Sequence, residues 1–362
     1  MTLLDTDTAA SQNRARVAFD HTHFTPKEAQ ARNRLNALKI LARFEQARAI
    51  DIAAGLSPER EFKAALSAAQ RTLKGLLRDK YVTRYLSDSR RVFYGLTAKG
   101  ARLLREYAYE GGDGIAQAPA SRVCEKSNPE HALWSSFFTI ASEARGLQAW
   151  TERELLPRYL STNPRTHTTE RSFPLSYRGN DGKRKGLMPD AMAASDYDDG
   201  VIWFEIERSA RGSARLDDLI GLVKKLGTEV NMGLGKKRVL RKVIILCKTS
   251  SILRRDRTHL VGRATAGDQL LRVRLGNNID EPALIEREPG CFDYYHYIER
   301  HANGVTSLAL EVGGQVHLQL LPMHLASYSY KHGAAHGWFD DGSLPFREPD
   351  SAWSEPIPFH QR

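Results

Sequence analysis

The sequence predicts a two-domain protein of mixed α+β or α/β class, and three observations support this. Its 362 residues suffice for two domains of ordinary size. Helical and strand-type apolar periodicities alternate along the chain, and a stretch rich in Gly, Ala, Ser and Pro at 111–127 reads as a linker. The formal net charge is +10, and residues 26–110 alone carry 18 Lys or Arg against 9 Asp or Glu. A basic excess concentrated in this way is typical of a nucleic-acid-binding module, although a solvated basic surface is the plain alternative.

The composition favours a protein of the cytoplasm over a membrane or secreted protein. It is 41% hydrophobic and 27% charged, and no apolar run approaches the roughly 20 residues that span a bilayer. The first residues lack the layout of a signal peptide. Cys124, Cys247 and Cys291 are too far apart for a zinc site or a disulfide framework. We therefore expect a cytoplasmic protein with no membrane partner.

The N-terminal domain is expected at residues 25–110 and begins with three helices. Thr25 can cap a helix that starts at Pro26. A short second helix is expected at 49–54, ending at Gly55, and a third at 57–79. The third helix has an apolar face and an opposite face of hydrogen-bond donors, which suit phosphates and base edges in a major groove. The residues of this polar face are Ser67, Gln70, Arg71, Lys74 and Arg78.

A hairpin and a fourth helix complete this domain. Aromatic and β-branched residues at 81–85 and 91–96 flank a polar turn, and Arg84, Arg90 and Arg91 would decorate the hairpin. Thr97 then caps another helix. Helix, helix, helix, hairpin, helix is the order of a winged helix, which predicts binding to double-stranded DNA. A winged helix used for protein contacts is the alternative.

The second domain is expected at 128–325, with an irregular tail at 326–362. A helix is predicted from Asn128 to Arg145, followed by a segment in which either Glu152 or Glu154 could supply an early acid. Residues 185–194 and 201–207 read as strands around a strong turn. If Ala194 pairs with Val201, Asp190 lies opposite Glu205, and Met188 lies opposite Glu207.

These carboxylates define the candidate catalytic site. Carboxylates gathered closely repel one another unless a cation lies between them, and Mg²⁺ prefers oxygen ligands. A bound metal of this kind supports phosphodiester cleavage. The alternative is an acidic sheet face paired with arginines such as Arg208 or Arg211.

The remaining elements are simpler. A helix is expected at 215–226, with Lys224 able to swing toward the carboxylates and Lys225 pointing away. A buried strand at 241–247, a basic helix at 250–271 and an edge hairpin around Gly313-Gly314 should follow. His317, His324, His332 and His336 match no metal-ligand spacing.

Pro189-Asp190 and Glu205-Ile206-Glu207 together resemble the PD-(D/E)XK nuclease superfamily. The fuller layout, over about residues 30–250 and including His131 and Trp150, resembles the bacterial replication-relaxation family. The resemblance implies that Asp190 and Glu205 bind Mg²⁺ and that Glu207 supports the metal or the attacking water. Glu207 stands where the nuclease pattern has Lys, so Lys224 would have to polarise the scissile phosphate. Otherwise, the site would bind metal poorly, or the fold would serve only to grip DNA.

The sequence therefore predicts a DNA-binding protein of a plasmid or mobile element, involved in replication or mobilisation, with a possible Mg²⁺-dependent nuclease domain. The alternatives are a non-catalytic DNA-binding regulator with a degenerate nuclease fold and a protein-interaction adaptor. A second copy of the chain and replication or mobilisation proteins are further possible partners.

Overall fold

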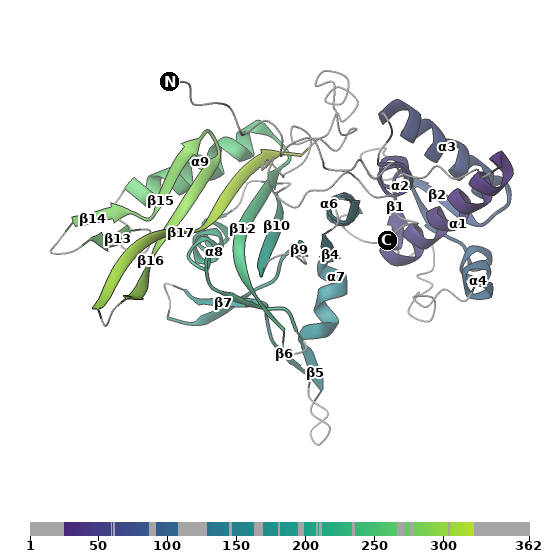
Figure 1. Ribbon diagram of the computed structural model, residues 1–362. Coiled ribbons are helices and arrows are strands. Elements are labelled where there is room, and N and C mark those ends of the chain that lie inside the picture. Colours follow the sequence, from purple (N-terminus) through teal and green to yellow (C-terminus); the bar gives the residue numbers. More distant parts are fainter. Residues whose placement is uncertain are drawn as a thin grey trace, which may run out of the picture.

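The computed structural model (Figure 1) shows a mixed helix and sheet protein with an eight-stranded sheet at its centre. The structure describes residues 25–58, 60, 62–86, 92–107, 129–144, 147–162, 169–179, 182–194, 199–207, 209, 212–233, 236–265, 272–275, 279–302 and 305–321. The linker predicted at 111–127 and the tail predicted at 326–362 lie outside these ranges. No helix among the described residues combines the length and apolarity that crossing a bilayer requires.

The N-terminal part consists of helices packed beside a small antiparallel sheet of order β1-β3-β2. Its elements are α1 (Pro26–Phe44), β1 (Gln46–Ala47), α2 (Ala49–Leu56), α3 (Phe62–Arg78), β2 (Val82–Leu86), β3 (Val92–Leu96) and α4 (Ala98–Glu106). The predicted start of α1 is confirmed. The Thr25 hydroxyl accepts from the backbone N–H of Glu28, whose carboxylate accepts from the N–H of Thr25 in return.

Gly55 does not end the second helix as predicted, because α2 continues to Leu56. Gly55 packs against α1 instead. A Cβ built on Gly55 would lie 2.5 Å from Ile40 Cδ1 of α1, so a larger residue would require the Ile40 side chain to move.

The large sheet has the order β15-β16-β17-β12-β10-β9-β4, with β11 paired to β12. The three central strands β10, β12 and β17 are parallel, and β9 and β4 extend the sheet beyond β10 as antiparallel strands. The strands are β4 (Gln148–Thr151), β9 (Ala191–Ala194), β10 (Gly200–Glu207), β11 (Glu229–Asn231), β12 (Lys237–Cys247), β15 (Leu284–Glu288), β16 (Cys291–Ala302) and β17 (Val305–Leu320).

Helices and three two-stranded hairpins surround this sheet. The helices are α6 (Pro129–Ala144), α7 (Glu152–Leu155), the 3₁₀ helix η2 (Leu156–Tyr159), α8 (Ser213–Val223) and α9 (Ser250–Thr265). The hairpins are β5 (Leu160–Thr162) with β6 (Thr169–Arg171), β7 (Leu175–Arg178) with β8 (Arg184–Leu187), and β13 (Arg272–Leu275) with β14 (Ile279–Pro282).

The prediction of an edge hairpin around Gly313-Gly314 is wrong. β17 runs through both glycines as one strand and lies inside the sheet, between β16 and β12. A Cβ on Gly313 would lie 2.2 Å from His296 Nδ1, and one on Gly314 would lie 2.5 Å from the carbonyl oxygen of Arg241. These glycines serve close approach within a sheet, which a glycine pair in the sequence does not distinguish from a turn.

Successive residues of the central strands enter two different cores. On one face, Phe204 and Ile206 join a cluster that includes α6 and the N-terminal helices. On the other face, Val201 and Trp203 join a cluster that includes Leu219 and other residues of α8. Since side chains alternate along a strand, this is the arrangement expected of a sheet covered on both sides.

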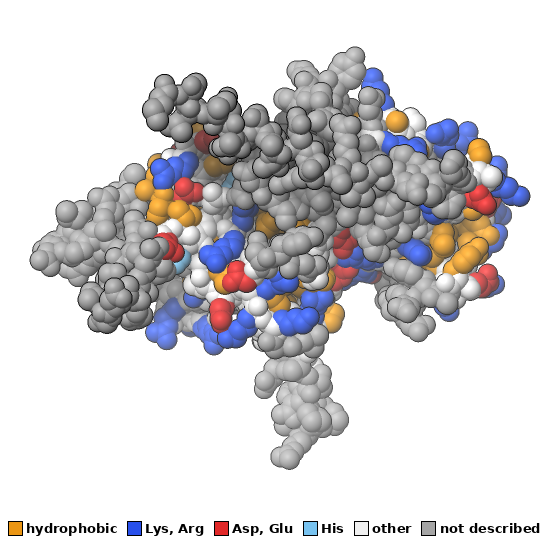
Figure 2. All heavy atoms as spheres, viewed as in Figure 1, with side chains coloured by type: hydrophobic (Ala, Val, Ile, Leu, Met, Phe, Trp, Pro, Cys, Tyr) orange, Lys and Arg blue, Asp and Glu red, His pale blue; other side chains and the backbone are white. Residues whose placement is uncertain are grey.

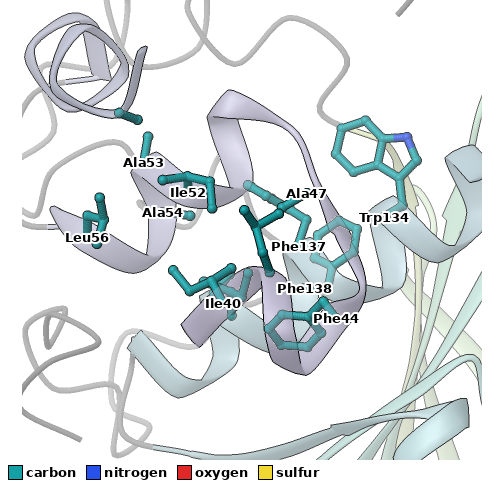
Figure 3. Packing of buried hydrophobic residues seen from close by; sticks show 14 of the residues in the cluster. Ile40, Phe44, Ala47, Ile52, Ala53, Ala54, Leu56, Trp134, Phe137 and Phe138 are labelled. Carbon is teal, nitrogen blue, oxygen red and sulfur yellow. The ribbon is translucent and has the colours of Figure 1, made fainter. Parts of the chain in front are cut away.

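Helix α6 joins the N-terminal part to the sheet. Figure 3 shows Phe137 and Phe138 of α6 beside Phe44 of α1 and Ile52 of α2, and Trp134 of α6 belongs to the same cluster. The ring of Phe138 stacks on that of Phe204 in the sheet, with centroids 6.2 Å apart. All three aromatic side chains of α6 are buried, and each fully buried Phe contributes about 1.5–3 kcal/mol. The two halves of the chain therefore share one hydrophobic core.

Two arginines reinforce this joint. Arg48 forms a salt bridge of 2.8 Å with Asp51, and its guanidinium carbon lies 4.1 Å from the ring centre of Trp134. Arg43 forms salt bridges of 2.7 Å with both Glu143 and Glu154. The side chains of Arg48 and Asp51 are 8% and 0% exposed, so each charge depends on the other for compensation.

Replacing Arg48 should destabilise the protein strongly. Arg48→Ala leaves the Asp51 carboxylate buried without its partner, and we expect a loss of about 3–5 kcal/mol in the free energy of unfolding, measured with urea. The double variant Arg48→Ala/Asp51→Ala should lose less than Arg48→Ala, because no unpaired charge remains. A loss below about 1 kcal/mol for Arg48→Ala, as for a surface pair, would contradict this account of the joint.

Candidate functional site

A cavity of about 480 Å³ opens between α6, the end of β8, β10 and α8. It gathers most of the predicted catalytic carboxylates. The lining residues are His131, Ala132, Gly186, Leu187, Met188, Asp190, Glu205, Ile206, Glu207, Ser209, Arg215, Asp218, Leu219 and Leu222.

The strand register that positions Asp190 is the predicted one. Val201 pairs with Ala194 across the antiparallel β9–β10 ladder. Beyond the last ladder pair, the N–H of Asp190 donates to the carbonyl of Phe204 at 3.1 Å, and Asp190 Oδ2 accepts from the N–H of Ile206 at 2.6 Å. Asp190 therefore lies beside Glu205, as the sequence predicted.

The predicted single strand over 185–194 is interrupted. β8 ends at Leu187 and pairs with β7, while β9 begins at Ala191, so Met188 does not lie in a ladder opposite Glu207. Pro189, between the two strands, has no N–H to give to a ladder and is buried. The break turns the chain so that Met188 lines the cavity instead.

Two helices hold Asp190 in place. His131 Nε2 of α6 lies 3.1 Å from Asp190 Oδ1. The hydroxyl of Ser135, one turn later on α6, donates to the carbonyl oxygen of Asp190 at 2.6 Å, and the N–H of Glu152 donates to the same oxygen at 3.0 Å. Both the side chain and the backbone of Asp190 are thus fixed from outside its own strand.

The charges around Asp190 shift the pKa values of its neighbours. Burial lowers the pKa of His131, but the hydrogen bond and charge of Asp190, with the charges of Glu152 and Glu205, outweigh burial and raise this pKa above its ordinary value of 6.5. Burial, followed by the charge of Asp190, raises the pKa of Glu152, against the opposing charges of His131 and Arg171. Both shifts favour the protonated form relative to the same side chain in water.

The structure separates the two acids between which the sequence could not choose. Glu152 is the acid whose pKa responds to Asp190 and His131. The carboxylate of Glu154 instead accepts from the N–H and hydroxyl of Thr151 and pairs with Arg43. Glu152 thus belongs with the acidic site, and Glu154 belongs to the joint between the two halves.

Glu205 and Glu207 both line the cavity from β10, in different surroundings. Glu205 is half-buried and accepts a hydrogen bond of 2.8 Å from the Trp203 indole. Glu207 is only 4% exposed. Among the described residues, no group of three or more His, Cys, Asp or Glu side chains is arranged to hold a metal ion. The carboxylates that line the cavity are oxygen donors of the type that Mg²⁺ prefers, and this ion is often held by one or two carboxylates together with water molecules.

The basic residue that α8 presents to the cavity is Arg215, and not Lys224. Arg215, Asp218 and Leu222 lie at steps of three and four on one face of the helix. Lys224 follows the end of the helix, about half a turn away from that face, and does not line the cavity. Arg215 is not among the site residues predicted from the sequence, because its place at the cavity depends on which face of α8 meets β10.

The second predicted site is the cationic face of α3. The side chains of Gln70, Arg71, Lys74 and Arg78 are all exposed, on the side of the helix opposite its buried residues Ala69, Leu73 and Leu76. Arg84 on β2 is exposed as well. In Figure 2, Lys and Arg side chains are visible in the region where Figure 1 draws α1 and α3. Arg90 and Arg91 lie outside the described residues.

Asp79 offsets part of the positive charge at the end of α3. Its carboxylate contacts Arg34 at 2.5 Å and Arg78 at 3.1 Å. The Nε of Arg71 lies 3.4 Å from the backbone carbonyl oxygen of Ser67 in the same helix. The exposed cations nearer the middle of α3, Arg71 and Lys74, are therefore the ones best placed to meet an anionic partner.

Comparison of the chain with protein-family models, with curated proteins and with solved structures found no match.

The raised pKa of His131 gives a testable dependence on pH. Asp190→Asn removes the charge that raises this pKa, so we expect the pKa of His131 to fall, as measured by NMR of labelled histidine. In the unmodified protein, the protonated His131 stabilises the fold below its ordinary pKa of 6.5, and this contribution is lost as pH rises through the higher folded-state pKa. The Asn variant should lack this loss. An unchanged pKa would contradict the ion pair.

Proposed function

We propose that this chain is a DNA-binding protein whose N-terminal part is a winged helix that grips duplex DNA through α3. One observation carries the proposal: Gln70, Arg71 and Lys74 form an exposed polar face on α3, whose other face is buried in the core. The order helix, strand, helix, helix, hairpin, helix and the sheet order β1-β3-β2 are consistent with a winged helix.

The length and chemistry of α3 suit the major groove of B-DNA. The helix has 17 residues, and a groove about 12 Å wide admits one α-helix. Arg71 and Lys74 can neutralise phosphates, and Gln70 can present an amide to a base edge. The exposed Arg84 on β2 adds a cation on the adjacent hairpin.

Within this proposal, the sheet domain is the scaffold of a non-catalytic regulator. The succession α6, β4, β9, β10, α8 and β12 is consistent with the PD-(D/E)XK-like fold that the sequence resembles. Glu207 stands where the nuclease pattern has Lys, and Asp190 is held by His131 and by the N–H of Ile206, which suits a structural role. By the resemblance to the replication-relaxation family, the regulated process is replication or mobilisation of a plasmid or mobile element.

DNA binding is tested by removing two cations from α3. In Arg71→Ala/Lys74→Ala, we expect weaker binding to duplex DNA. The slope of log affinity against log salt should become shallower by about 2, because two phosphate contacts are lost. The measurement is fluorescence anisotropy with a labelled duplex over a range of NaCl concentrations. Unchanged affinity and slope would count against α3 as the DNA-binding face.

A Mg²⁺-dependent nuclease is the second candidate function, favoured by the meeting of Asp190, Glu205 and Glu207 in one cavity. It is tested by nicking of supercoiled plasmid with and without Mg²⁺. If the cavity cleaves DNA, Asp190→Ala should abolish nicking, and Arg215→Ala should impair it more than Lys224→Ala, because only Arg215 lines the cavity. Nicking that survives in Asp190→Ala would exclude this site, and absence of nicking by the unmodified protein would favour the regulator.

A further inference from the structure

The β7–β8 hairpin concentrates positive charge at the rim of the cavity. Residues 175–187, which form the hairpin, contain four Lys or Arg and one acid, Asp181, and Arg171 at the end of β6 adds a fifth cation nearby in the sequence. Leu187, at the end of β8, lines the cavity, and the Tyr177 hydroxyl of β7 donates to Asp218, another lining residue. Figure 2 shows Lys and Arg side chains gathered along the lower edge of the molecule, near the place where Figure 1 draws β7.

Two of these cations face each other across the hairpin. Arg178 and Arg184 are directly opposite in the antiparallel register, and both are exposed. Like charges directly opposite one another destabilise a strand pair. Arg184 Nε donates to the Ser176 hydroxyl at 2.8 Å, a neutral partner that orients the guanidinium without cancelling its charge. An anion bound between the two arginines would remove this repulsion.

Aromatic rings alternate with the cations of this segment. The Nζ of Lys185 lies 5.9 Å from the ring centre of Tyr177, and the guanidinium carbon of Arg171 lies 4.9 Å from that of Phe173. The Phe173 ring covers Gly186, where a Cβ would come within 2.2 Å of it. Cations interleaved with aromatic rings are typical of surfaces that follow a nucleic-acid strand, whose phosphates and bases they meet in turn.

We propose that the β7–β8 hairpin is a second phosphate-binding surface, which holds a DNA strand at the mouth of the carboxylate cavity while α3 grips duplex DNA. The inference rests on the proposed function for the identity of the partner, DNA. The hairpin and α3 are separate elements, so the contribution of each to DNA binding can be removed independently.

The test compares three double variants that each remove two positive charges. Arg178→Ala/Arg184→Ala alters the hairpin, Arg71→Ala/Lys74→Ala alters α3, and Arg254→Ala/Arg255→Ala removes two exposed cations of α9 as the matched control. Binding to labelled duplex and single-stranded oligonucleotides is measured by anisotropy across a salt series. For the hairpin variant, we expect the slope of log affinity against log salt to become shallower on at least one of the two DNA forms. The expected change is about 2 for duplex DNA or about 1.4 for single-stranded DNA. The α9 control should leave the slope unchanged. The DNA form with the larger change in slope shows whether the hairpin binds duplex or single-stranded DNA.

A second variant separates binding from folding. Arg178→Glu converts the repulsive cross-strand pair into an attractive one, so Tm should stay the same or rise while DNA affinity falls further than in Arg178→Ala. A merely structural role for Arg178 would not move stability and binding in opposite directions. If the hairpin double variant matches the α9 control while the α3 variant loses affinity, the inference is overturned and the proposed function stands. If the unmodified protein binds no DNA, both are overturned.

Discussion

The structure depends on the burial of helix α6 on both of its sides. One side packs on the sheet through contacts such as that of Phe138 with Phe204, and the other packs on α1 and α2. Because an aromatic helix surrounded by protein cannot slide without opening cavities, α6 fixes the N-terminal part relative to the sheet. The same helix carries His131 and Ser135 to Asp190. The element that joins the two halves is thus also the one that orders the acidic cavity.

The Arg43 and Arg48 networks make this joint specific as well as apolar. Apolar contact alone tolerates several packings of similar volume, whereas a buried ion pair is costly in every arrangement that separates its members. Arg43 reaches Glu143 on α6 and Glu154 on α7, so it ties α1 to two different elements. Arg48 reaches Asp51 and lies over Trp134. The Arg43 salt bridges and the contact of Arg48 with Trp134 therefore favour one orientation of the N-terminal helices relative to α6.

Much of the local structure could be predicted from the sequence, because it depends on neighbours. The cap at Thr25, the start of α6 and the pairing of Ala194 with Val201 all follow from short-range turn and capping chemistry. The place of β17 inside the sheet could not be predicted, because its two glycines are needed for close contact with His296 and Arg241, which are distant in the sequence. The choice of Glu152 over Glu154 likewise depends on Arg43, more than a hundred residues away.

The shared core around Trp134 also bears on how the protein unfolds. Removing the N-terminal helices would uncover Trp134 and Phe137 to water, and removing the sheet would uncover Phe138. Neither half can lose its structure without leaving large apolar surfaces of the other hydrated. We therefore expect both halves of the chain to unfold in one cooperative transition. A fragment that begins after residue 128 would expose the aromatic face of α6 and would be prone to aggregation.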